Sequence, residues 1–489
     1  MLKFILNDQQ IETDLAPGMT VLDFVRYRQD LKGTKIGCRE GDCGACTVLV
    51  GELLDDRVNY RSMTSCLMPM ANAHGKHIVT VEGINKPDGG LTKVQQAMVD
   101  ESGTQCGFCT VGFVMSLTGF CIDDSTKTCE AAVSSVDGNI CRCTGYKSIE
   151  RAACAIASDM SIAPASAGAL NVDLAISRDI IPSYFSGIKT RLTELRQDHL
   201  PFTFDSSLLR PVAGGTDLYV QRPDEMAETD GSYVFDNSDL RRITETDEFV
   251  EIGASAVVTD LLFSPIFQNL FSDLYKHLKL ISSTPIRNMA TLAGNFVNAS
   301  PIGDMTAWFL ALDAEIELSA AGRNATVMER ADLPETGAPS VAVTGSKTSR
   351  WIALKDLYLG YKQLAKTEDE FVSKIRFRKS FTHFNFEKVC KRTYLDIASV
   401  NTAISLQVVD GVIKDALVSA GGVAPTPLYL RKTSQFLRGK EIGESVVAEA
   451  AEIIQTEISP ISDVRGSEEY KRLLLRQLFK AHFVELFGI

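Results

Sequence analysis

The hydrophobic and polar residues at the start of the chain alternate as they do in a small β-sheet. Residues 2–15 predict two strands joined by a polar turn at Asn7 and Asp8. A helix is predicted after Thr20, because apolar residues follow at helical spacing and a threonine hydroxyl can accept hydrogen bonds from the first amides of a helix. Residues 33–44 then hold four glycines in twelve positions, which indicates an irregular loop that folds closely around another group.

The pattern changes several times along the rest of the chain. A β-branched stretch at residues 47–50 predicts a strand, and helical spacing dominates from residue 91 to residue 157. Residues 159–182 lack sustained periodicity, and short strands alternate with helical segments through residues 181–370. In the C-terminal part, strands are predicted at 403–409 and 412–419 and helices at 445–456 and 468–486.

These changes predict several domains. A chain of 489 residues is too long for one hydrophobic core, and roughly 100 to 200 residues per domain gives about three or four. We expect a mostly β domain at 1–85, a mostly helical domain at 86–158, a linker at 159–180, an α+β domain at 181–380 and a small α+β domain at 381–489.

Composition narrows the possible functions. The chain is 45% apolar and 23% charged, as ordinary globular proteins are, and its net charge of -12 argues against nucleic-acid binding. The apolar N-terminal run turns polar at Asn7, too early for a signal peptide, and no apolar run reaches the length of a membrane span. We therefore expect a cytoplasmic protein without membrane contact, whose cysteines stay as thiols or bind metal.

Eleven of the twelve cysteines precede residue 155, and the first four form a recognisable group. Cys38, Cys43 and Cys46 follow the order C-x4-C-x2-C, with Cys66 further on, which is the ligand spacing of a plant-type [2Fe–2S] ferredoxin. A glycine-rich loop lets three thiolates converge while backbone amides donate to the sulfurs. The alternative, buried or zinc-binding cysteines, is disfavoured because zinc sites usually use paired C-x2-C knuckles.

A second group consists of a C-x2-C pair, Cys106 and Cys109, and a C-x-C pair, Cys141 and Cys143. Each pair stands near a predicted helix start, where the helix dipole favours an anionic cluster. By spacing alone the group suits zinc or iron–sulfur, although C-x-C is tight for tetrahedral zinc. The other cysteines share no suggestive spacing and are predicted to be inert apolar residues, namely Cys121, Cys129, Cys154 and Cys390.

Two stretches of the body suggest nucleotide binding. No G-x-G-x-x-G motif follows a strand, so a Rossmann site is not indicated. Residues 211–218 place Gly214 and Gly215 after a short apolar run, where successive amides can cradle a pyrophosphate. That signal is weak by itself, because a Gly-Gly turn is usually only a turn, but the Gly- and Asn-containing stretch at 286–304 strengthens it.

The order of the cysteine motifs is specific to one family. A ferredoxin-like motif, then Gln105-Cys-Gly-Phe-Cys-Thr110, then Gly138-Asn-Ile-Cys-Arg-Cys-Thr-Gly-Tyr146, resembles the iron–sulfur region of the xanthine dehydrogenase and aldehyde oxidase family across residues 1–155. The resemblance implies a β-grasp ferredoxin-like domain and an all-α domain, each binding one [2Fe–2S] cluster. It also implies that Gln105 lies against the pterin of a molybdenum cofactor, although a polar helix cap is the alternative. The sequence departs from the family at Val111 and at Lys147-Ser148, away from the cysteines.

The body resembles the FAD-binding domain of the same family, whose fold also occurs in the vanillyl-alcohol oxidase group, followed by its small C-terminal flavoprotein domain. The resemblance implies that the glycine turn binds the pyrophosphate, Thr291 and Asn295 bind phosphate and ribose, and Asp304 lies on the adenosine side. Val372 is expected to pack on the cofactor and Lys388 to approach the flavin ring, where a cation favours the anionic reduced form. Ile281 departs from the phenylalanine of mammalian-type enzymes. The implied FAD contacts are Ala213, Gly214, Gly215, Thr216, Asp217, Leu218, Thr291, Asn295, Asp304, Val372 and Lys388.

The resemblance implies an electron-transfer subunit with no catalytic residue of its own. A large molybdopterin-binding partner would hydroxylate the substrate, and electrons would pass through the two clusters to FAD and on to NAD or oxygen. The fused order of cluster and flavin domains favours xanthine over aldehyde or heteroaromatic substrates. The alternatives are the same subunit of another molybdenum hydroxylase, a stand-alone iron–sulfur flavin reductase, and a non-enzymatic redox sensor without FAD. Substrate, final acceptor and subunit stoichiometry are not encoded in these motifs.

Overall fold

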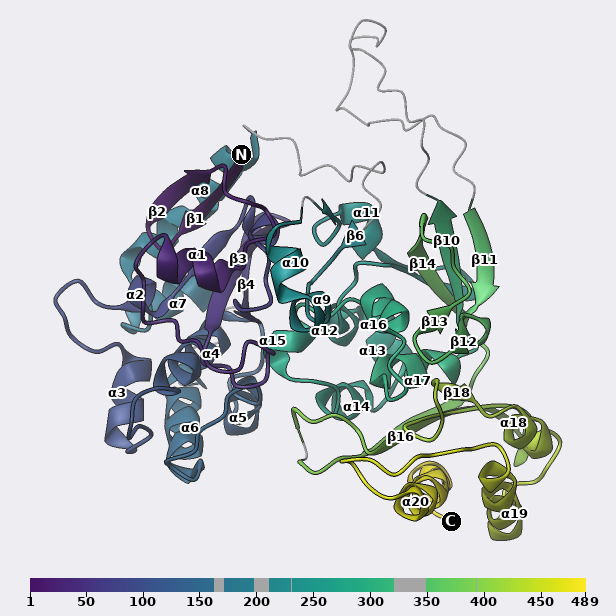
Figure 1. The fold of residues 1–489 in the computed structure, drawn as a ribbon. Helices are drawn as coiled ribbons and strands as arrows, with labels where there is room; N and C mark the ends of the chain where they lie inside the picture. The colour runs from purple at the N-terminus through teal and green to yellow at the C-terminus, as the bar shows by residue number, and fades with distance from the viewer. Residues whose placement is uncertain (162–170, 198–210, 230, 321–348, 393) are drawn as a thin grey trace, which may run out of the picture.

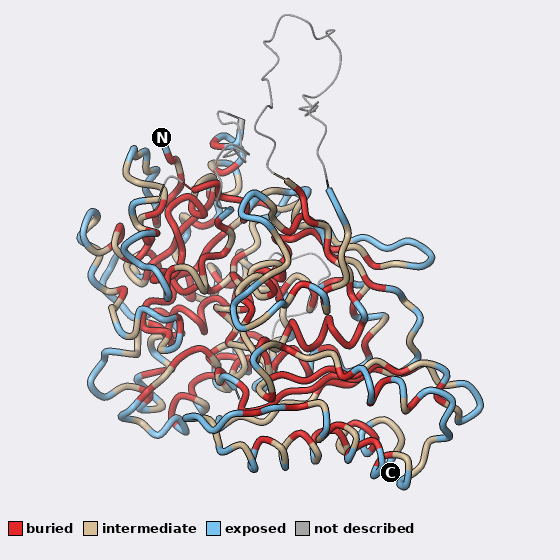
Figure 2. Tube along the Cα trace, turned by 45° about the vertical axis from the view of Figure 1, so that its right-hand side comes forward, coloured by how far each residue is buried: buried red, intermediate tan, exposed pale blue. Residues whose placement is uncertain are grey.

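The computed structural model describes residues 1–161, 171–197, 211–229, 231–320, 349–392 and 394–489. The N-terminal third forms two small regions side by side, a central region follows, and a C-terminal region packs beneath the central one in the view of Figure 1. The buried segments lie inside these regions, while exposed segments run over their surfaces (Figure 2). This is the expected multidomain α+β architecture, and the fold class is confirmed.

The first region is a five-stranded sheet in the order β2-β1-β5-β3-β4. Strand β1 pairs with β5 in parallel, and the other pairs are antiparallel. Helix α1 packs on the sheet, with the rings of Phe4 and Phe24 5.5 Å apart, and Thr20 caps it as predicted. The elements are β1 (Leu2–Leu6), β2 (Gln9–Thr13), α1 (Val21–Tyr27), β3 (Thr47–Leu54), β4 (Arg57–Thr64), η1 (Met70–Ala73), β5 (His77–Val79) and α2 (Val81–Ile84).

The second region is helical and is built around α4, whose residues from Gly112 to Ile122 are all buried. Its elements are α3 (Lys93–Asp100), α4 (Thr110–Ile122), α5 (Cys129–Ser135), α6 (Lys147–Ser161), α7 (Asn171–Ser177), η2 (Ser183–Gly187) and α8 (Ile188–Gln197). The stretch expected to be an irregular linker is helical at both ends, since α6 reaches Ser161 and α7 follows, while residues 162–170 lie outside the described ranges. Ala175 and Ile180 are buried in the core of the helical region, so packing makes up for the weak periodicity of α7.

The central region contains a second five-stranded sheet, antiparallel throughout, in the order β11-β10-β14-β9-β8. Its core is rich in aromatic side chains around the fully buried Trp308. The helices are α9 (Leu218–Gln221), α10 (Pro223–Ala227), α11 (Ser238–Arg241), α12 (Val258–Phe263), α13 (Pro265–Leu270), α14 (Leu274–Lys279), α15 (Thr284–Arg287), α16 (Leu292–Asn298), α17 (Asp304–Leu310) and η3 (Leu354–Asp356). The strands are β6 (Pro211–Val212), β7 (Ser232–Tyr233), β8 (Ile243–Glu245), β9 (Phe249–Gly253), β10 (Glu315–Ala320), β11 (Ser349–Ala353), β12 (Tyr358–Gly360), β13 (Gln363–Leu364) and β14 (Glu370–Arg378).

The described residues of the C-terminal region form a four-stranded antiparallel sheet with three helices, of which the sequence pattern predicts two strands and two helices. Helix α17 of the central region packs against β16 and β17, so the two regions share an extensive contact. The elements are β15 (His383–Val389), β16 (Val400–Val409), β17 (Val412–Gly421), β18 (Leu428–Tyr429), α18 (Arg431–Leu437), α19 (Glu444–Gln455) and α20 (Glu468–Phe487).

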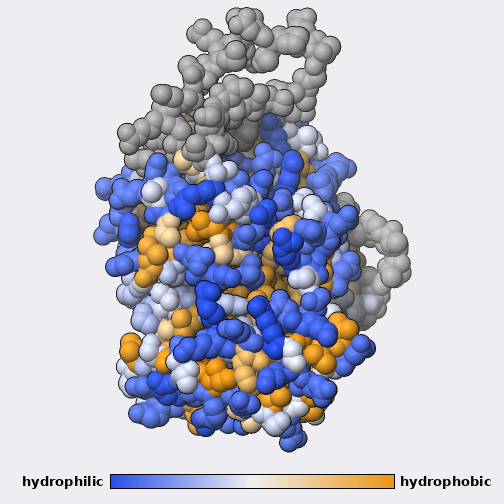
Figure 3. Space-filling model, turned by 90° about the vertical axis from the view of Figure 1, so that its right-hand side faces the viewer, coloured by the Kyte–Doolittle hydropathy of each residue, from blue (hydrophilic) through white to orange (hydrophobic). Residues whose placement is uncertain are grey.

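No helix in the described ranges is both long and apolar enough to cross a bilayer. The face shown in Figure 3 is mostly hydrophilic, with hydrophobic residues in small groups. Scattered exposure of this kind is normal for a globular protein.

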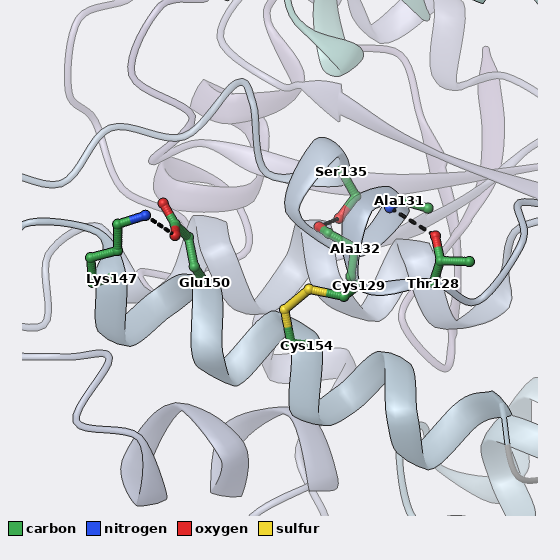
Figure 4. The surroundings of a disulfide bond; sticks show 8 residues. All are labelled: Thr128, Cys129, Ala131, Ala132, Ser135, Lys147, Glu150 and Cys154. Atoms are coloured by element: carbon green, nitrogen blue, oxygen red, sulfur yellow. Dashed lines mark hydrogen bonds and ion pairs between the residues drawn. A yellow bond between two sulfur atoms is a disulfide. The ribbon is translucent and has the colours of Figure 1, made fainter.

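Two cysteines predicted to be inert are joined. Cys129 at the start of α5 and Cys154 in α6 form a disulfide, with Cα atoms 4.3 Å apart (Figure 4). The prediction of separate, inert thiols is therefore wrong for this pair. A separation of 25 residues carries no disulfide signature, because only the packing of α5 on α6 brings the two side chains together.

Candidate functional site

The first four cysteines meet in the loop between α1 and β3 and just after β4. Their sulfurs form two pairs, since Cys38 shares a hydrogen bond with Cys43 and Cys46 shares one with Cys66. Cys46 and Cys66 are buried, while Cys38 and Cys43 are half-buried. The loop therefore brings together the four residues that the spacing singled out.

Backbone amides of this loop point at sulfur. The amides of Glu40 and Asp42 lie 3.3 and 3.4 Å from the Sγ of Cys38. A hydrogen bond from Cys43, helped by these amides and opposed by burial, lowers the pKa of Cys38 to about 5. Gly41 has a φ of 77°, a conformation that side-chain-bearing residues rarely adopt, so the turn that aims the amides depends on a glycine.

The second four cysteines also meet as two pairs, in front of α4 and α6. The sulfurs of Cys106 and Cys143 are 3.7 Å apart, and Cys109 shares a hydrogen bond with Cys141. The Sγ of Cys141 accepts from the amide of Thr144 at 3.4 Å and from its hydroxyl at 3.2 Å. Cys106 and Cys143 are exposed, so this site lies at the surface and the first lies deeper.

The arrangement in pairs fits a two-iron cluster. Two thiolates on one tetrahedral metal with bonds of about 2.3 Å lie about 3.8 Å apart, close to the 3.7 Å between Cys106 and Cys143. No three His, Cys, Asp or Glu side chains in the described part of the chain converge on a single metal ion. A [2Fe–2S] cluster has two irons with two cysteines each, so it needs two neighbouring pairs rather than a triad.

The two cysteine sites are joined directly. The amide of Ile140 donates to the carbonyl of Cys43 at 3.1 Å, and the side chain of Asn139 donates to the carbonyl of Gly44 at 3.1 Å. A Cβ on Gly44 would lie 2.4 Å from the carbonyl of Gly138. The loop that carries Cys141 therefore sits on the loop that carries Cys43, with no room between them.

The glycine turn of the central region packs against the first cysteine region. A Cβ on Gly214 would lie 1.8 Å from the carbonyl of Met289, and one on Gly215 would lie 2.5 Å from the carbonyl of Leu67, next to Cys66. Asn72 donates to the carbonyl of Ala213 at 2.9 Å. The turn is thus a tight, glycine-dependent element at the boundary between the cysteine and central regions.

The polar residues expected around a dinucleotide are held by protein contacts. Thr291 caps α16 by accepting from the amide of Gly294, and the Oδ1 of Asn295 accepts from Thr306. Asp217 accepts from Asn298 at 2.7 Å, and burial raises its pKa. The backbone of Thr216 lies in the turn, Leu218 begins α9, and Val372 is buried in β14 within the aromatic core.

Lys388 and Asp304 form a buried ion pair, with 2.7 Å between Nζ and Oδ2. The Lys388 side chain is 1% exposed and the Asp304 side chain 12%. Sequence reasoning placed Lys388 at the flavin ring and Asp304 on the adenosine side, yet the two side chains touch. Two side chains in contact cannot lie at opposite ends of one FAD. Lys388 at the flavin ring and Asp304 on the adenosine side are therefore not compatible as assigned.

Sequence reasoning missed Asn401 and the segment 280–284. Asn401 donates to the Oδ1 of Asp304 at 2.6 Å, while its own Oδ1, although buried, finds no partner in the described part of the chain. Lys388 donates to the carbonyl of Leu280 at 2.7 Å. No local signal could reveal these contacts, because 97 residues separate Asn401 from Asp304.

Comparison with known proteins agrees with this geometry. The family models that match are a 2Fe-2S iron-sulfur cluster binding domain at residues 4–71, a [2Fe-2S] binding domain at 80–154, an FAD binding domain in molybdopterin dehydrogenase at 193–331 and a CO dehydrogenase flavoprotein C-terminal domain at 386–486. Together they account for the two cysteine sites and for the central and C-terminal regions.

Similar proteins match over nearly the whole chain. Xanthine dehydrogenase of Emericella nidulans is 28% identical over 92% of this chain and 36% of its own length. Aldehyde oxidase 2 of Mus musculus is 26% identical over 99% of this chain and 39% of its own length. The solved carbon monoxide dehydrogenase of Hydrogenophaga pseudoflava covers 58% of this chain and 94% of the matched chain, at 24% identity and a TM-score of 0.48.

The chain spans somewhat more than a third of the length of these curated relatives. The matches at 4–71 and 80–154 coincide with the paired cysteines, and those at 193–331 and 386–486 coincide with the glycine turn and with Lys388. The chain therefore carries the [2Fe–2S] and FAD electron-transfer module of the molybdenum hydroxylase family.

Proposed function

We propose that this chain is the electron-transfer subunit of a xanthine dehydrogenase. In this proposal a large partner subunit holds the molybdenum cofactor and hydroxylates hypoxanthine or xanthine, and NAD or oxygen is the final acceptor. The bound clusters would carry single electrons and FAD would collect them in pairs. The observation that carries the proposal is the direct contact of two paired-cysteine sites, Ile140 on Cys43, at the border of a flavin-binding region.

We propose a ligand set and a flavin site within this frame. Cys38 with Cys43 and Cys46 with Cys66 would each bind one iron of the first cluster, and Cys106 with Cys143 and Cys109 with Cys141 those of the second. Because Lys388 and Asp304 touch, we place both at the same end of FAD, with the glycine turn at the phosphates. The free Oδ1 of Asn401 beside Asp304 supports that placement.

The test is to purify the chain with whatever binds it and to count iron, acid-labile sulfide, flavin and molybdenum. We expect about four irons and one FAD per chain, with molybdenum only in a co-purifying large subunit. Zinc in place of iron, or no flavin, would overturn the proposal. Iron and flavin without any molybdenum partner would favour a stand-alone flavin reductase.

A second candidate is the same subunit of an aldehyde- or heteroaromatic-oxidising enzyme. It is favoured by the match to aldehyde oxidase 2, which covers 99% of this chain. The purified complex should be assayed with xanthine, hypoxanthine, an aliphatic aldehyde and an N-heteroaromatic compound, with NAD and then oxygen as acceptor. Turnover of purines above the other substrates supports the first candidate, and the reverse order supports the second.

A further inference from the structure

The segment 137–140, between α5 and Cys141, contacts both the first cysteine site and the central region. Ile140 and Asn139 contact the loop of the first cysteine site, as described above. Asp137, two residues before Asn139, instead contacts the central region, between α14 and α15. Helix α15 lies at the boundary between the N-terminal and central regions in Figure 1. One short segment thus fastens both cysteine sites to the flavin-binding region.

The Asp137 carboxylate is buried, and both of its oxygens accept hydrogen bonds. Its side chain is 2% exposed, and its Oδ2 accepts from Lys279 at 2.8 Å and from Arg287 at 2.7 Å. Its Oδ1 accepts from the amide of Thr284 at 2.7 Å. Burial by itself would raise the pKa of Asp137, but the charges of Arg287 and Lys279 outweigh burial and hold it below its ordinary value.

The segment 280–284 accepts hydrogen bonds from Arg287, which pairs with Asp137, and from Lys388. Arg287 donates to the carbonyl of Ile281 at 2.8 Å and to that of Ser282 at 2.9 Å. Ser282 has a φ of 52°, so the segment is fixed in a left-handed turn. Lys388, which pairs with Asp304, donates to the carbonyl of Leu280. A single chain of contacts runs from Asp137 to the ion pair placed at the flavin.

The segment 137–140 and the start of α15 approach each other too closely to move independently. A Cβ on Gly138 would lie 2.8 Å from the ring of Pro285 and 3.1 Å from the Cβ of Ser283. Close packing of this kind transmits a displacement instead of absorbing it. Loss of the Asp137 charge would also leave Lys279 and Arg287 as two buried neighbouring cations, which repel each other in a medium of low dielectric constant.

We propose that Asp137 is a positioning residue that fixes the flavin-facing segment 280–284 against the cluster-binding loop 137–141. In this role, which rests on the proposed function, Asp137 sets the separation between flavin and clusters. The chemistry affected would be electron exchange within the loaded chain, in which two reduced clusters would supply one electron each and FAD would accept both with two protons from water. Because electron transfer slows steeply with distance, a small displacement at Asp137 slows this exchange without touching a cysteine.

The test compares D137N with E101Q in the cofactor-loaded chain. Both changes convert an ion-paired carboxylate of the helical region to an amide, but Glu101 pairs with Arg151 within that region. The clusters are reduced with a pulse of dithionite and the passage of electrons to FAD is followed optically. We expect D137N to keep its iron and FAD and to exchange electrons more slowly, by up to roughly a hundredfold, since a misplacement of about 1 Å between reacting groups can cost that much. E101Q should match the wild type.

A second readout separates positioning from general damage. The magnetic coupling between the two reduced clusters should be unchanged in D137N, because Ile140 still holds Cys43. If D137N does not fold, K279Q removes only one of the three contacts to Asp137 and should slow the exchange by a smaller factor. Exchange in D137N or K279Q within twofold of the wild type would overturn the role of Asp137. A wild-type chain without iron or flavin would overturn the proposed function itself, and the role of Asp137 with it.

Discussion

At the scale of single residues, Lys388 offers the sharpest test of the flavin-binding region. K388M removes the cation from a buried pair and leaves Asp304 with only the amide of Asn401. Breaking a buried ion pair from one side costs about 3–5 kcal/mol, since an uncompensated charge remains in the interior. We expect that loss in urea unfolding, together with weaker FAD retention on gel filtration. The double variant K388M/D304N should recover part of the stability, and a cost below about 1 kcal/mol for K388M would contradict the buried pair.

A buried histidine makes stability depend on pH. His482 is fully buried between Asn385 and Thr402, and burial, with a smaller contribution from His277, lowers its pKa to about 3. In the unfolded chain its pKa is about 6.5, so between these values only the unfolded chain binds the proton. Stability from this group is therefore complete above about pH 6.5 and is lost as the pH falls towards 3, by up to about 1.4 kcal/mol per pH unit. H482Q should make the free energy of unfolding fall less steeply between about pH 6 and pH 5, by about 1 kcal/mol per unit. Parallel curves for both proteins would show that His482 titrates normally.

At the scale of elements, the loop that carries Cys43 and Cys46 needs glycine both because space is short and because its backbone conformation is left-handed. Gly44 and Gly75 both have positive φ, 67° and 70°. A Cβ on Gly44 would lie 2.4 Å from Asn139 and from the carbonyl of Gly138, whereas nothing lies within 4 Å of one on Gly75. Both alanine variants lose about 1–2 kcal/mol of stability through the strained backbone conformation. The difference between their stabilities therefore measures the effect of crowding at Gly44. We expect G44A to lose iron and sulfide from the first site and G75A to keep both. Full iron content in G44A would show that the two loops can separate.

The pairing of α5 with α6 makes a prediction about Cys129 and Cys154. Alkylation of the unfolded chain should reveal two more thiols after reduction than before it. The chain-entropy model gives a stabilisation of about 3–4 kcal/mol for a loop of this length, so C129S should lose that much free energy of unfolding in a urea titration. The wild type measured in reductant is the control and should behave as C129S does. Equal thiol counts before and after reduction would mean that the bridge does not form in solution.

At the scale of the whole molecule, local chemistry could be predicted and long-range assembly could not. The cysteine motifs, the cap at Thr20 and the final helices follow from spacing and periodicity over a few residues. The contact of Asp137 with Arg287 spans 150 residues, and that of Lys388 with Asp304 spans 84. Charged residues with no motif around them look like surface residues in a sequence, because only the packing of separate regions buries them. Lys388 and Asp304 were both singled out, but their contact with each other was not predicted.

Long-range packing also forms the interface between the first region and the central one, where three ion pairs cross among the described residues. The shortest distances are 3.0 Å for Arg241 with Glu52, 2.6 Å for Lys76 with Asp236 and 2.8 Å for Arg61 with Asp260. Four of these residues, Glu52, Arg61, Lys76 and Arg241, line a cavity of about 10 Å³. The cations Lys76 and Arg241 outweigh burial and lower the pKa of Glu52 to about 2.

E52Q leaves Arg241 and Lys76 short of one anion at this interface, so the two regions should separate more readily. We expect a loss of about 1–3 kcal/mol in stability, between the values for exposed and for buried pairs, because Glu52 and Arg241 are only partly buried. Limited proteolysis between the regions should be faster, with both clusters still bound. D124N removes the exposed partner of Arg57 and should cost less than about 1 kcal/mol. High salt should weaken the wild-type interface less than it weakens the exposed pair of Arg57 with Asp124, because partly buried pairs are screened less than exposed ones. If E52Q instead resists protease as the wild type does, apolar packing rather than the ion pairs holds the cluster and flavin regions together.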